Sequence, residues 1–371
     1  MIPAPEKATF NRPAPWLQNC WYQAAWSHEL AAAPLLTRRI LDRDVLLFRD
    51  TSGAARAIED RCPHRFAPLS AGTLKDGAIQ CGYHGLGFNG EGRCVINPHG
   101  AIPAAMRVRS YRVVERHQAV WIWMGAGIPD DARLPALDFI DQTPDTAKFF
   151  GHMDTAVNYQ LLTDNILDLS HADFLHPTSL GGIMIGAKTT TRQENSDYII
   201  QWLSDDCIPP PAYRSLIPPP SRADIWTEVR WQAPAVMILG TGANPTGAPR
   251  DPSREATTLH NMTPASPTRT HYFFCSTRRF NVHDAAFNQM LSSLITGAFE
   301  NEDKPMLEKQ QRAIGTREFW SMKPMLLNID IGAVKVRRLL ADMIDAEHST
   351  MPDGTSSVPA SPADAGSGTV P

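Results

Sequence analysis

The sequence predicts an α+β protein in which an antiparallel β domain precedes a larger domain of strands and helices. Residues 16–124 contain short apolar or alternating runs separated by turn residues, which is typical of antiparallel strands. Residues 125–135 are rich in Gly, Pro and Asp and are predicted to be a linker. Helical and strand-like patterns both follow, so we place the two domains at residues 1–130 and 131–348.

The strands of the first domain are short. Residues 39–49 break at Asp42-Arg43-Asp44, which predicts two strands joined by a turn. Ala119-Val-Trp-Ile-Trp123 alternates around its aromatic residues. These patterns predict a small β domain.

The second domain mixes helices with strands. Helices are predicted at residues 158–174, at 285–314 with an interruption near Pro305, and at 330–348. Strand candidates include residues 227–239 and 271–275. Residues 349–371 consist mainly of Ser, Pro, Gly, Ala and Thr, which predicts a disordered tail.

Two stretches of the second domain are predicted to be long loops. Residues 208–220 contain six prolines, and residues 240–252 are rich in Gly and Pro. Proline cannot donate to a sheet ladder. Because long loops in compact domains are often functional, we expect these two to be lids or substrate-facing walls.

Composition excludes several classes of partner. The chain has 371 residues, 43% hydrophobic, with 35 basic and 39 acidic side chains and a net charge of -4. It lacks a basic run, so nucleic acid and anionic membrane surfaces are not expected partners. Neither an export signal nor a run of ~20 apolar residues is found, which predicts a cytoplasmic protein without a membrane span. Cys20, Cys94, Cys207 and Cys275 resemble packed free thiols, as expected in a reducing compartment.

The first constellation of metal ligands is Cys62-x-His64 followed by Cys81-x-x-His84. Structural zinc sites usually take thiols and imidazoles as separate pairs, whereas here each half offers one of each. In a Rieske [2Fe–2S] cluster, two thiolates hold one iron and two imidazoles hold the other. The motif therefore predicts such a cluster, with Gly82 and Gly85 allowing a tight turn around it.

A glycine pattern inside this motif is a false signal. Gly85-x-Gly87-x-x-Gly90 matches a dinucleotide-binding loop, but such a loop must open a helix. The residues that follow are strand-like and end at Pro98. No bound nicotinamide or flavin is therefore expected.

The second constellation contains His171 and His176 close to several carboxylates. On one ideal helix these two rings would point ~140° apart, since each residue turns by ~100°. Pro177 disfavours helical geometry for the residue before it, so the helix should end near Leu175 and His176 can turn back. Two imidazoles then meet one ion, with Asp168 on the same face as His171.

A third ligand has to come from another part of the chain. Two histidines and one carboxylate leave open positions on Fe(II) for O₂. The segment Asn301-Glu302-Asp303-Lys304-Pro305-Met306-Leu307-Glu308 offers the carboxylate. Composition alone does not separate Asp303 from Glu302 or Glu308.

Together, these motifs resemble the Rieske non-haem iron oxygenases, in particular the vanillate O-demethylase oxygenases and their toluenesulfonate and dicamba relatives. The matching segments are Asp164-Asn165, residues 306–312 and residues 327–338, and the similarity spans roughly residues 16–347. The resemblance selects Asp303 as the third ligand. It also implies that Asn165 and Asp168 belong to the catalytic machinery.

The family resemblance implies one [2Fe–2S] cluster and one mononuclear Fe(II) in each subunit of a homo-oligomer, usually a head-to-tail trimer. Asp168 is then expected to hydrogen-bond both His171 and the partner subunit's His84. Electrons are expected from a separate NAD(P)H-dependent reductase that carries flavin and iron–sulfur groups.

The resemblance also implies the reaction. We expect O₂-dependent hydroxylation of a small aromatic acid, most simply the O-demethylation of a vanillate-like methoxybenzoate. Ring hydroxylation, N-demethylation or oxidation of a methyl group on another aromatic such as an aryl sulfonate are the alternatives. A Rieske electron carrier without catalysis is a different class, but such a carrier needs only the first domain. Tyr213, Arg214, Trp231, His260 and Asn261 are candidate walls of the substrate pocket.

Overall fold

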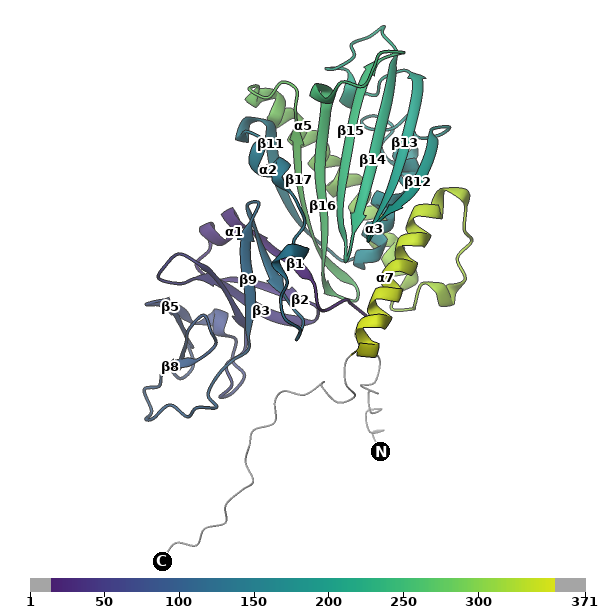
Figure 1. Cartoon of the computed structure of the whole chain (residues 1–371). Helices are drawn as coiled ribbons and strands as arrows, with labels where there is room; N and C mark the ends of the chain where they lie inside the picture. Colours follow the sequence, from purple (N-terminus) through teal and green to yellow (C-terminus); the bar gives the residue numbers. More distant parts are fainter. Residues whose placement is uncertain (1–14, 351–371) are drawn as a thin grey trace, which may run out of the picture.

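Three antiparallel sheets form the frame of the protein in the computed structural model, which describes residues 15–350 (Figure 1). Two of the sheets use residues 21–123, and the third uses residues 148–278. This arrangement confirms the predicted order of a β domain followed by an α+β domain. The predicted tail at residues 349–371 lies almost entirely outside the described residues.

The larger N-terminal sheet has the strand order β1-β10-β9-β4-β3-β2. Its strands are β1 (Trp21–Trp26), β2 (Leu36–Ile40), β3 (Arg43–Arg49), β4 (Ala55–Glu59), β9 (Ser110–Arg116) and β10 (Ala119–Trp123). The predicted break in residues 39–49 is present as a tight turn at Leu41 and Asp42, both with positive φ. The short helix α1 (Ser27–Ala32) follows β1.

The smaller N-terminal sheet has the order β5-β6-β7-β8. Its strands are β5 (Thr73–Lys75), β6 (Ala78–Gln80), β7 (Gly87–Phe88) and β8 (Cys94–Ile96). The glycine-rich stretch from Gly85 to Gly90 therefore leads into a hairpin and not into a helix, as predicted.

The seven-stranded sheet has the order β11-β17-β16-β15-β14-β13-β12. Its strands are β11 (Lys148–Thr155), β12 (Lys188–Glu194), β13 (Asp197–Cys207), β14 (Ala223–Gln232), β15 (Val236–Pro245), β16 (Glu255–Ser266) and β17 (Arg269–Arg278). From β12 to β17 the chain runs as a meander, and β11 completes the sheet at β17.

Two sequence predictions in this sheet are wrong. Residues 227–239 form a hairpin and not one strand, because Pro234 has no N–H to continue a ladder. Residues 240–252 are not all loop, since β15 continues to Pro245. Gly242 serves close packing here: a Cβ atom at this position would lie 2.3 Å from the Trp226 ring.

Helices cover one face of the seven-stranded sheet and connect its edges (Figure 1). They are α3 (Tyr159–Leu167), α4 (Ala172–Leu175), α5 (Ala285–Ala298), α6 (Lys304–Ile314) and α7 (Ile331–Thr350). The short helix α2 (Asp138–Gln142) packs on the other face, where its Ile140 joins a cluster with Phe273 and Cys275. Helix α3 contacts β16, α6 and α7. It therefore lies between the sheet and the C-terminal helices.

The predicted continuous helix at residues 158–174 is wrong in one respect. Helix α3 ends at Leu167, and Asp168 is extended, with φ -134° and ψ 97°. The Asp168 carboxylate accepts from the backbone N–H of Ser170 at 2.9 Å and so starts a new turn. Helix α4 ends at Leu175, as Pro177 predicted.

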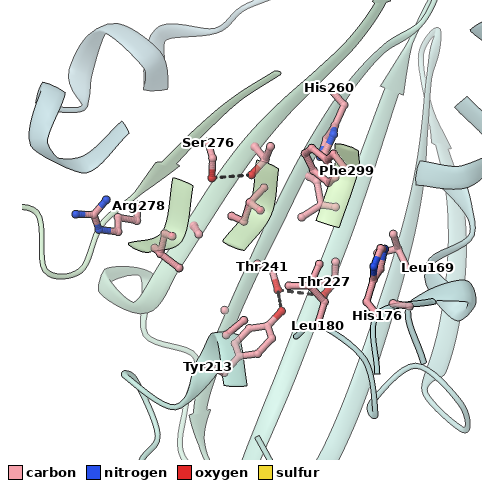
Figure 2. Close-up of a pocket in the computed structure, with 18 of the residues that line it drawn as sticks. Leu169, His176, Leu180, Tyr213, Thr227, Thr241, His260, Ser276, Arg278 and Phe299 are labelled. Atoms are coloured by element: carbon pink, nitrogen blue, oxygen red, sulfur yellow. Dashed lines mark hydrogen bonds between the residues drawn. The ribbon is translucent and has the colours of Figure 1, made fainter. Parts of the chain in front are cut away.

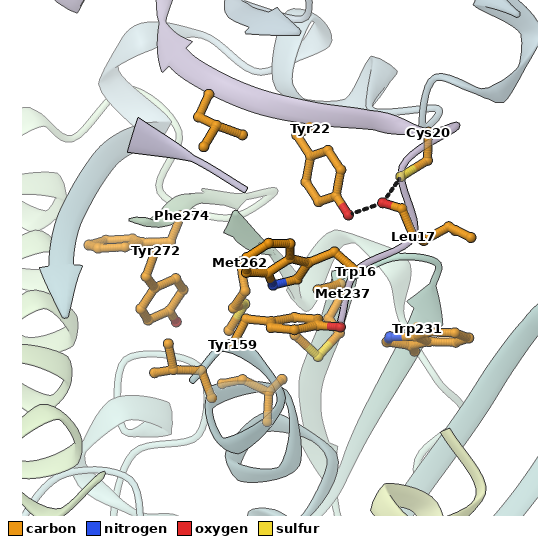
Figure 3. Packing of buried hydrophobic residues seen from close by; sticks show 14 of the residues in the cluster. Trp16, Leu17, Cys20, Tyr22, Tyr159, Trp231, Met237, Met262, Tyr272 and Phe274 are labelled. Carbon is orange, nitrogen blue, oxygen red and sulfur yellow. Dashed lines mark hydrogen bonds between the residues drawn. The ribbon is translucent and has the colours of Figure 1, made fainter. Parts of the chain in front are cut away.

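The hydrophobic core is continuous across the two parts of the chain (Figure 3). Trp16, Leu17 and Tyr22 of the N-terminal part pack in one cluster with Tyr159 and Trp231 of the second. Polar contacts accompany this packing, because the Asn261 amide donates to the Gln23 side chain at 3.1 Å and Thr263 donates to the Gln23 carbonyl at 2.8 Å. Between residues 15 and 350, no helix is long and apolar enough to cross a membrane.

Candidate metal centres and active site

The first constellation gathers in two loops beside the small sheet. The thiols of Cys62 and Cys81 are buried, whereas His64 and His84 lie nearer the surface with ring centroids 4.6 Å apart. All six cysteines are free thiols, as expected for packed or ligating residues. Two buried thiols and two imidazoles nearer the surface match the donor set of a Rieske cluster.

The two loops are built alike. The Cys62 N–H donates to the carbonyl of Ala67 at 2.8 Å, and the Cys81 N–H donates to that of Leu86 at 2.7 Å. In each loop the residue four positions after the cysteine has positive φ, +61° at Phe66 and +73° at Gly85. This shared turn points backbone N–H groups inward, and those of His64 and Arg65 hydrogen-bond the Cys62 sulfur.

Burial raises the pKa of the Cys62 thiol, and those backbone N–H groups oppose the rise. A metal ion removes this penalty, because a coordinated thiol binds as thiolate. The pocket around Cys62 and Cys81 thus suits two thiolates only when a positive centre is present.

The second constellation brings His171, His176 and Asp303 together. Nε2 of His176 lies 3.2 Å from Asp303 Oδ2, and Nε2 of His171 lies 3.5 Å from Asp303 Oδ1. The possible ligand atoms of all three lie within 4.8 Å of one another. His176 and Asp303 are buried.

The other ring nitrogen of each histidine has an oxygen acceptor. Nδ1 of His171 donates to the backbone carbonyl of Asp168 at 2.6 Å, and Nδ1 of His176 donates to the Glu302 carboxylate. Placing the proton on Nδ1 leaves the Nε2 lone pair of each ring facing Asp303. Two imidazole nitrogens and a carboxylate on one face fit an iron(II) ion with open positions.

Burial lowers the pKa of His176, but the hydrogen bonds and charges of Asp303 and Glu302 outweigh burial, so the pKa is raised. A proton on Nε2 would fill the place of a cation between His176 and Asp303. The site therefore favours positive charge at this point.

Irregular helix geometry positions these ligands. Asp303 ends a π-helical turn, Phe299–Asp303, between α5 and α6, and Pro305 follows in the first turn of α6. Single π-turns inside helices are common at functional sites. The turn directs Asp303 to the metal site while its neighbour Glu302 lies behind His176. The contact between Glu302 and His176 was not predicted from the sequence.

Asn165 and Asp168 lie beside the three ligands. The Asn165 amide donates to Asp303 Oδ1 at 3.2 Å. Asp168 contacts His171 through its backbone carbonyl, and its carboxylate bonds Ser170 instead. This differs from the expected hydrogen bond between the Asp168 carboxylate and the imidazole, because the break in the helix turns that carboxylate toward its own chain.

A cavity of about 170 Å³ opens beside the His171–His176–Asp303 cluster (Figure 2). A cavity of about 150 Å³ holds one benzene ring, so this one suits a single substituted ring. Its walls are largely apolar, and they include Leu169, Leu180, Met184, Leu216, Leu239, Leu291, Ile295 and Phe299. The first predicted loop contributes Tyr213 and Leu216 to the wall. In the range of the second, Thr241 and Gly242 line the cavity, but they belong to strand β15 and not to a loop.

His260 is a polar side chain in the sheet wall of the cavity. It is buried on β16, its ring lies 5.6 Å from that of Phe299, and its Nδ1 is 2.6 Å from the Tyr272 hydroxyl. Burial lowers the pKa of His260 to about 3, against the opposing charge of Asp303. His260 is therefore neutral, and its Nε2 has no partner among the described residues.

Of the other residues predicted to line the substrate pocket, only one does so. Tyr213 lines the cavity, but Arg214, Trp231 and Asn261 do not. Asn261 follows His260 on β16, so it faces the opposite side of the sheet and contacts Gln23. Trp231 is fully buried in the main core. The sequence reasoning missed the hydroxyl side chains of the wall, whose alternation along the strands was the available signal.

Comparison with known proteins decides the family. Residues 20–112 match the Rieske [2Fe-2S] domain, and residues 155–346 match the vanillate O-demethylase oxygenase C-terminal domain. The chain belongs to the Rieske non-haem iron oxygenases.

Relatives of this oxygenase match over nearly their whole length. It is 37% identical to the dicamba O-demethylase oxygenase component of Stenotrophomonas maltophilia over 87% of this chain and 96% of the relative. It is 35% identical to the chloroacetanilide N-alkylformylase oxygenase component of Rhizorhabdus wittichii, over 90% of this chain and 97% of that one. The crystal structure of dicamba monooxygenase bound to dicamba superposes with a TM-score of 0.82 at 33% identity, covering 90% and 98% of the two chains.

Proposed function

We propose that this oxygenase removes the methyl group of a small methoxy-substituted aromatic acid, with a vanillate-like methoxybenzoate as the model substrate. The observation that carries the proposal is a ring-sized apolar cavity directly beside the His171–His176–Asp303 cluster. The similarity to a dicamba O-demethylase and to the vanillate O-demethylase domain supports it.

The proposed ligands follow from the donor sets. Cys62, Cys81, His64 and His84 would hold the [2Fe–2S] cluster, and the His171, His176 and Asp303 side chains would hold Fe(II). When bound, these centres supply single electrons and the oxidation of a C–H bond by O₂. The net reaction converts Ar–O–CH₃, O₂, two electrons and two protons into Ar–OH, formaldehyde and water, because the hydroxylated methyl is a hemiacetal that collapses.

The chain's own residues orient the substrate and exclude water. In this proposal the Tyr272 hydroxyl donates to His260 Nδ1, which puts the His260 proton on Nε2, at the cavity wall. This N–H is suited to donate to a carboxylate or ether oxygen of the substrate. Asn165 holds the Asp303 carboxylate in place.

Partners and location belong to the same proposal. A separate NAD(P)H-dependent reductase would deliver the electrons, in keeping with relatives that are described as oxygenase components. We place the protein in the cytoplasm as a trimer in which the partner subunit's His84 approaches Asp168. Determining the mass of the protein by chromatography tests the trimer. The Asp168→Asn variant tests the contact, and we expect it to slow electron transfer without loss of iron.

The similarity to an N-alkylformylase component favours N-dealkylation as the second candidate. Turnover with NADH, a vanillate-type reductase and a panel of methoxylated, N-alkylated, sulfonated and unsubstituted aromatic acids separates the two. Formaldehyde from O-methyl substrates supports the proposal. Products only from N-alkyl or methyl-free rings would exclude O-demethylation.

A further inference from the structure

Three hydroxyl groups meet on the wall of the cavity (Figure 2). Tyr213 comes from the proline-rich loop, and Thr227 and Thr241 are paired neighbours on β14 and β15. The Tyr213 hydroxyl lies 2.7 Å from the Thr241 oxygen, and the Thr227 hydroxyl lies 3.0 Å from the same oxygen. We call Tyr213, Thr227 and Thr241 the hydroxyl triad.

The protons of the triad are committed to bonds within the protein. Thr241 donates its own proton to the backbone carbonyl of Trp226 at 2.9 Å. Its oxygen can then only accept, so Tyr213 and Thr227 both donate to it and fill its two lone pairs. Burial raises the pKa of Tyr213, which keeps the phenol neutral and able to donate.

This arrangement leaves acceptors facing the cavity. The oxygens of Tyr213 and Thr227 each retain unused lone pairs, and both residues line the cavity. A ligand group that donates a hydrogen bond is satisfied there without any change. A group that only accepts would have to break a bond of the hydroxyl triad first.

His260 lies at a different point of the same wall. His260 is opposite Met237 on β15, four residues before Thr241. At ~3.3 Å per residue, His260 and the triad are about 13 Å apart along the strand. The sheet wall of the cavity thus carries His260 and the oxygen acceptors of the hydroxyl triad about 13 Å apart along the strand direction.

We propose that the hydroxyl triad recognises a hydrogen-bond-donating substituent, a hydroxyl or amino group, on the ring of the substrate. This inference rests on the proposed function, whose substrate class it narrows. The triad also fastens the loop at residues 208–222 to the sheet, so a test must separate recognition from loop stability.

The test compares ligands that differ at one substituent. Anaerobic calorimetry on the purified holoenzyme measures Kd for 3-methoxybenzoates carrying hydroxyl, amino, hydrogen or methoxy at position 4. One neutral hydrogen bond corresponds to about tenfold in Kd. We expect the hydroxyl and amino ligands to bind about tenfold more tightly than the hydrogen and methoxy ligands.

Two variants and one control locate the effect. Tyr213→Phe and Thr227→Val each remove one acceptor and should reduce the tenfold preference to about threefold or less, whatever they do to overall affinity. Thr227→Val keeps the test open if Tyr213→Phe does not fold. Ser276→Ala removes a cavity hydroxyl that bonds Thr258 and lies outside the triad, so it should keep the full preference.

The outcomes are distinct. A wild-type protein without the preference, or both triad variants with the preference intact, overturns the inference even if formaldehyde is formed. A triad-dependent preference without formaldehyde supports the inference and removes the demethylase proposal. If none of the four ligands binds, both are wrong.

Discussion

Arg337 of α7 is predicted to hold the helix that carries Asn165 in place. Its guanidinium donates to both oxygens of Asp164, at 3.0 and 2.9 Å from Nε and 2.6 Å from a terminal nitrogen, and to Gln160 at 2.6 Å. The Arg337 side chain is 7% exposed and that of Asp164 is 23% exposed. The pair is therefore largely shielded from water.

Arg337→Met removes the charge but keeps much of the side-chain volume. Removing one member of a buried pair typically costs 3–5 kcal/mol, because the other charge is left without compensation. Since Asp164 retains some exposure, we expect a loss of about 3 kcal/mol in the free energy of unfolding. Burial already raises the pKa of Asp164 against the pull of Arg337, so the variant should raise it further.

Urea unfolding of the holoprotein, followed by tryptophan fluorescence and circular dichroism, measures this loss. Arg338→Met is the matched control, since Arg338 is the next residue on α7 and is exposed; it should cost less than about 0.5 kcal/mol. The loss of unfolding free energy in the double variant Arg337→Met/Asp164→Asn should be smaller than the sum of the two single losses by about 1 kcal/mol or more. Equal effects of Arg337→Met and Arg338→Met, or strict additivity, would refute the reasoning.

Three further predictions concern the metal site, the cavity wall and the domain interface. Asp303→Ala should lower the iron content from three to two atoms per two sulfides while the visible spectrum of the [2Fe–2S] cluster persists; full iron retention would exclude Asp303 as a ligand. Asp173→Asn should raise KM several-fold with little change in kcat, because the Asp173 carboxylate accepts from backbone N–H groups of residues 182–185, next to the cavity; unchanged steady-state kinetics would contradict this. Burial lowers the pKa of His271 from 6.5 to about 4, so the unfolded chain binds a proton in this window that the folded chain does not, and stability falls as the pH falls through it. Comparing the unfolding of His271→Gln with wild type at pH 7 and 4.5 should show about 2.5 kcal/mol less acid destabilisation in the variant, and equal pH slopes would show that His271 titrates normally.

Local chemistry made much of the molecule predictable from sequence. Pro177 constrains the backbone of His176 directly, so the end of α4 at Leu175 followed from two adjacent residues. The spacing of Cys62, His64, Cys81 and His84 needs only two turns, each closed by its own backbone hydrogen bonds. Such features do not depend on distant parts of the chain.

Neighbouring residues with similar chemistry were harder to separate. Glu302 and Asp303 are adjacent carboxylates, and only the π-turn decides which one faces the His171–His176 pair. His260 and Asn261 are adjacent polar residues of one strand, and only the side on which the helices pack decides which one reaches the cavity. In both cases a rotation of the backbone, which sequence patterns do not encode at single-residue precision, assigns the role.

The segments that resembled the oxygenase family are linked in space in a way that explains why each is needed. Asp164, from the first segment, binds Arg337, from the last, across the interface of α3 and α7. Asn165 follows Asp164 and binds Asp303, which is four residues before Leu307 in the middle segment. One chain of contacts therefore connects the C-terminal helix to the metal ligands. Regular helices alone would not place those ligands: the site depends on the break at Asp168 and on the π-turn before Lys304, and both departures need the surrounding contacts to hold them.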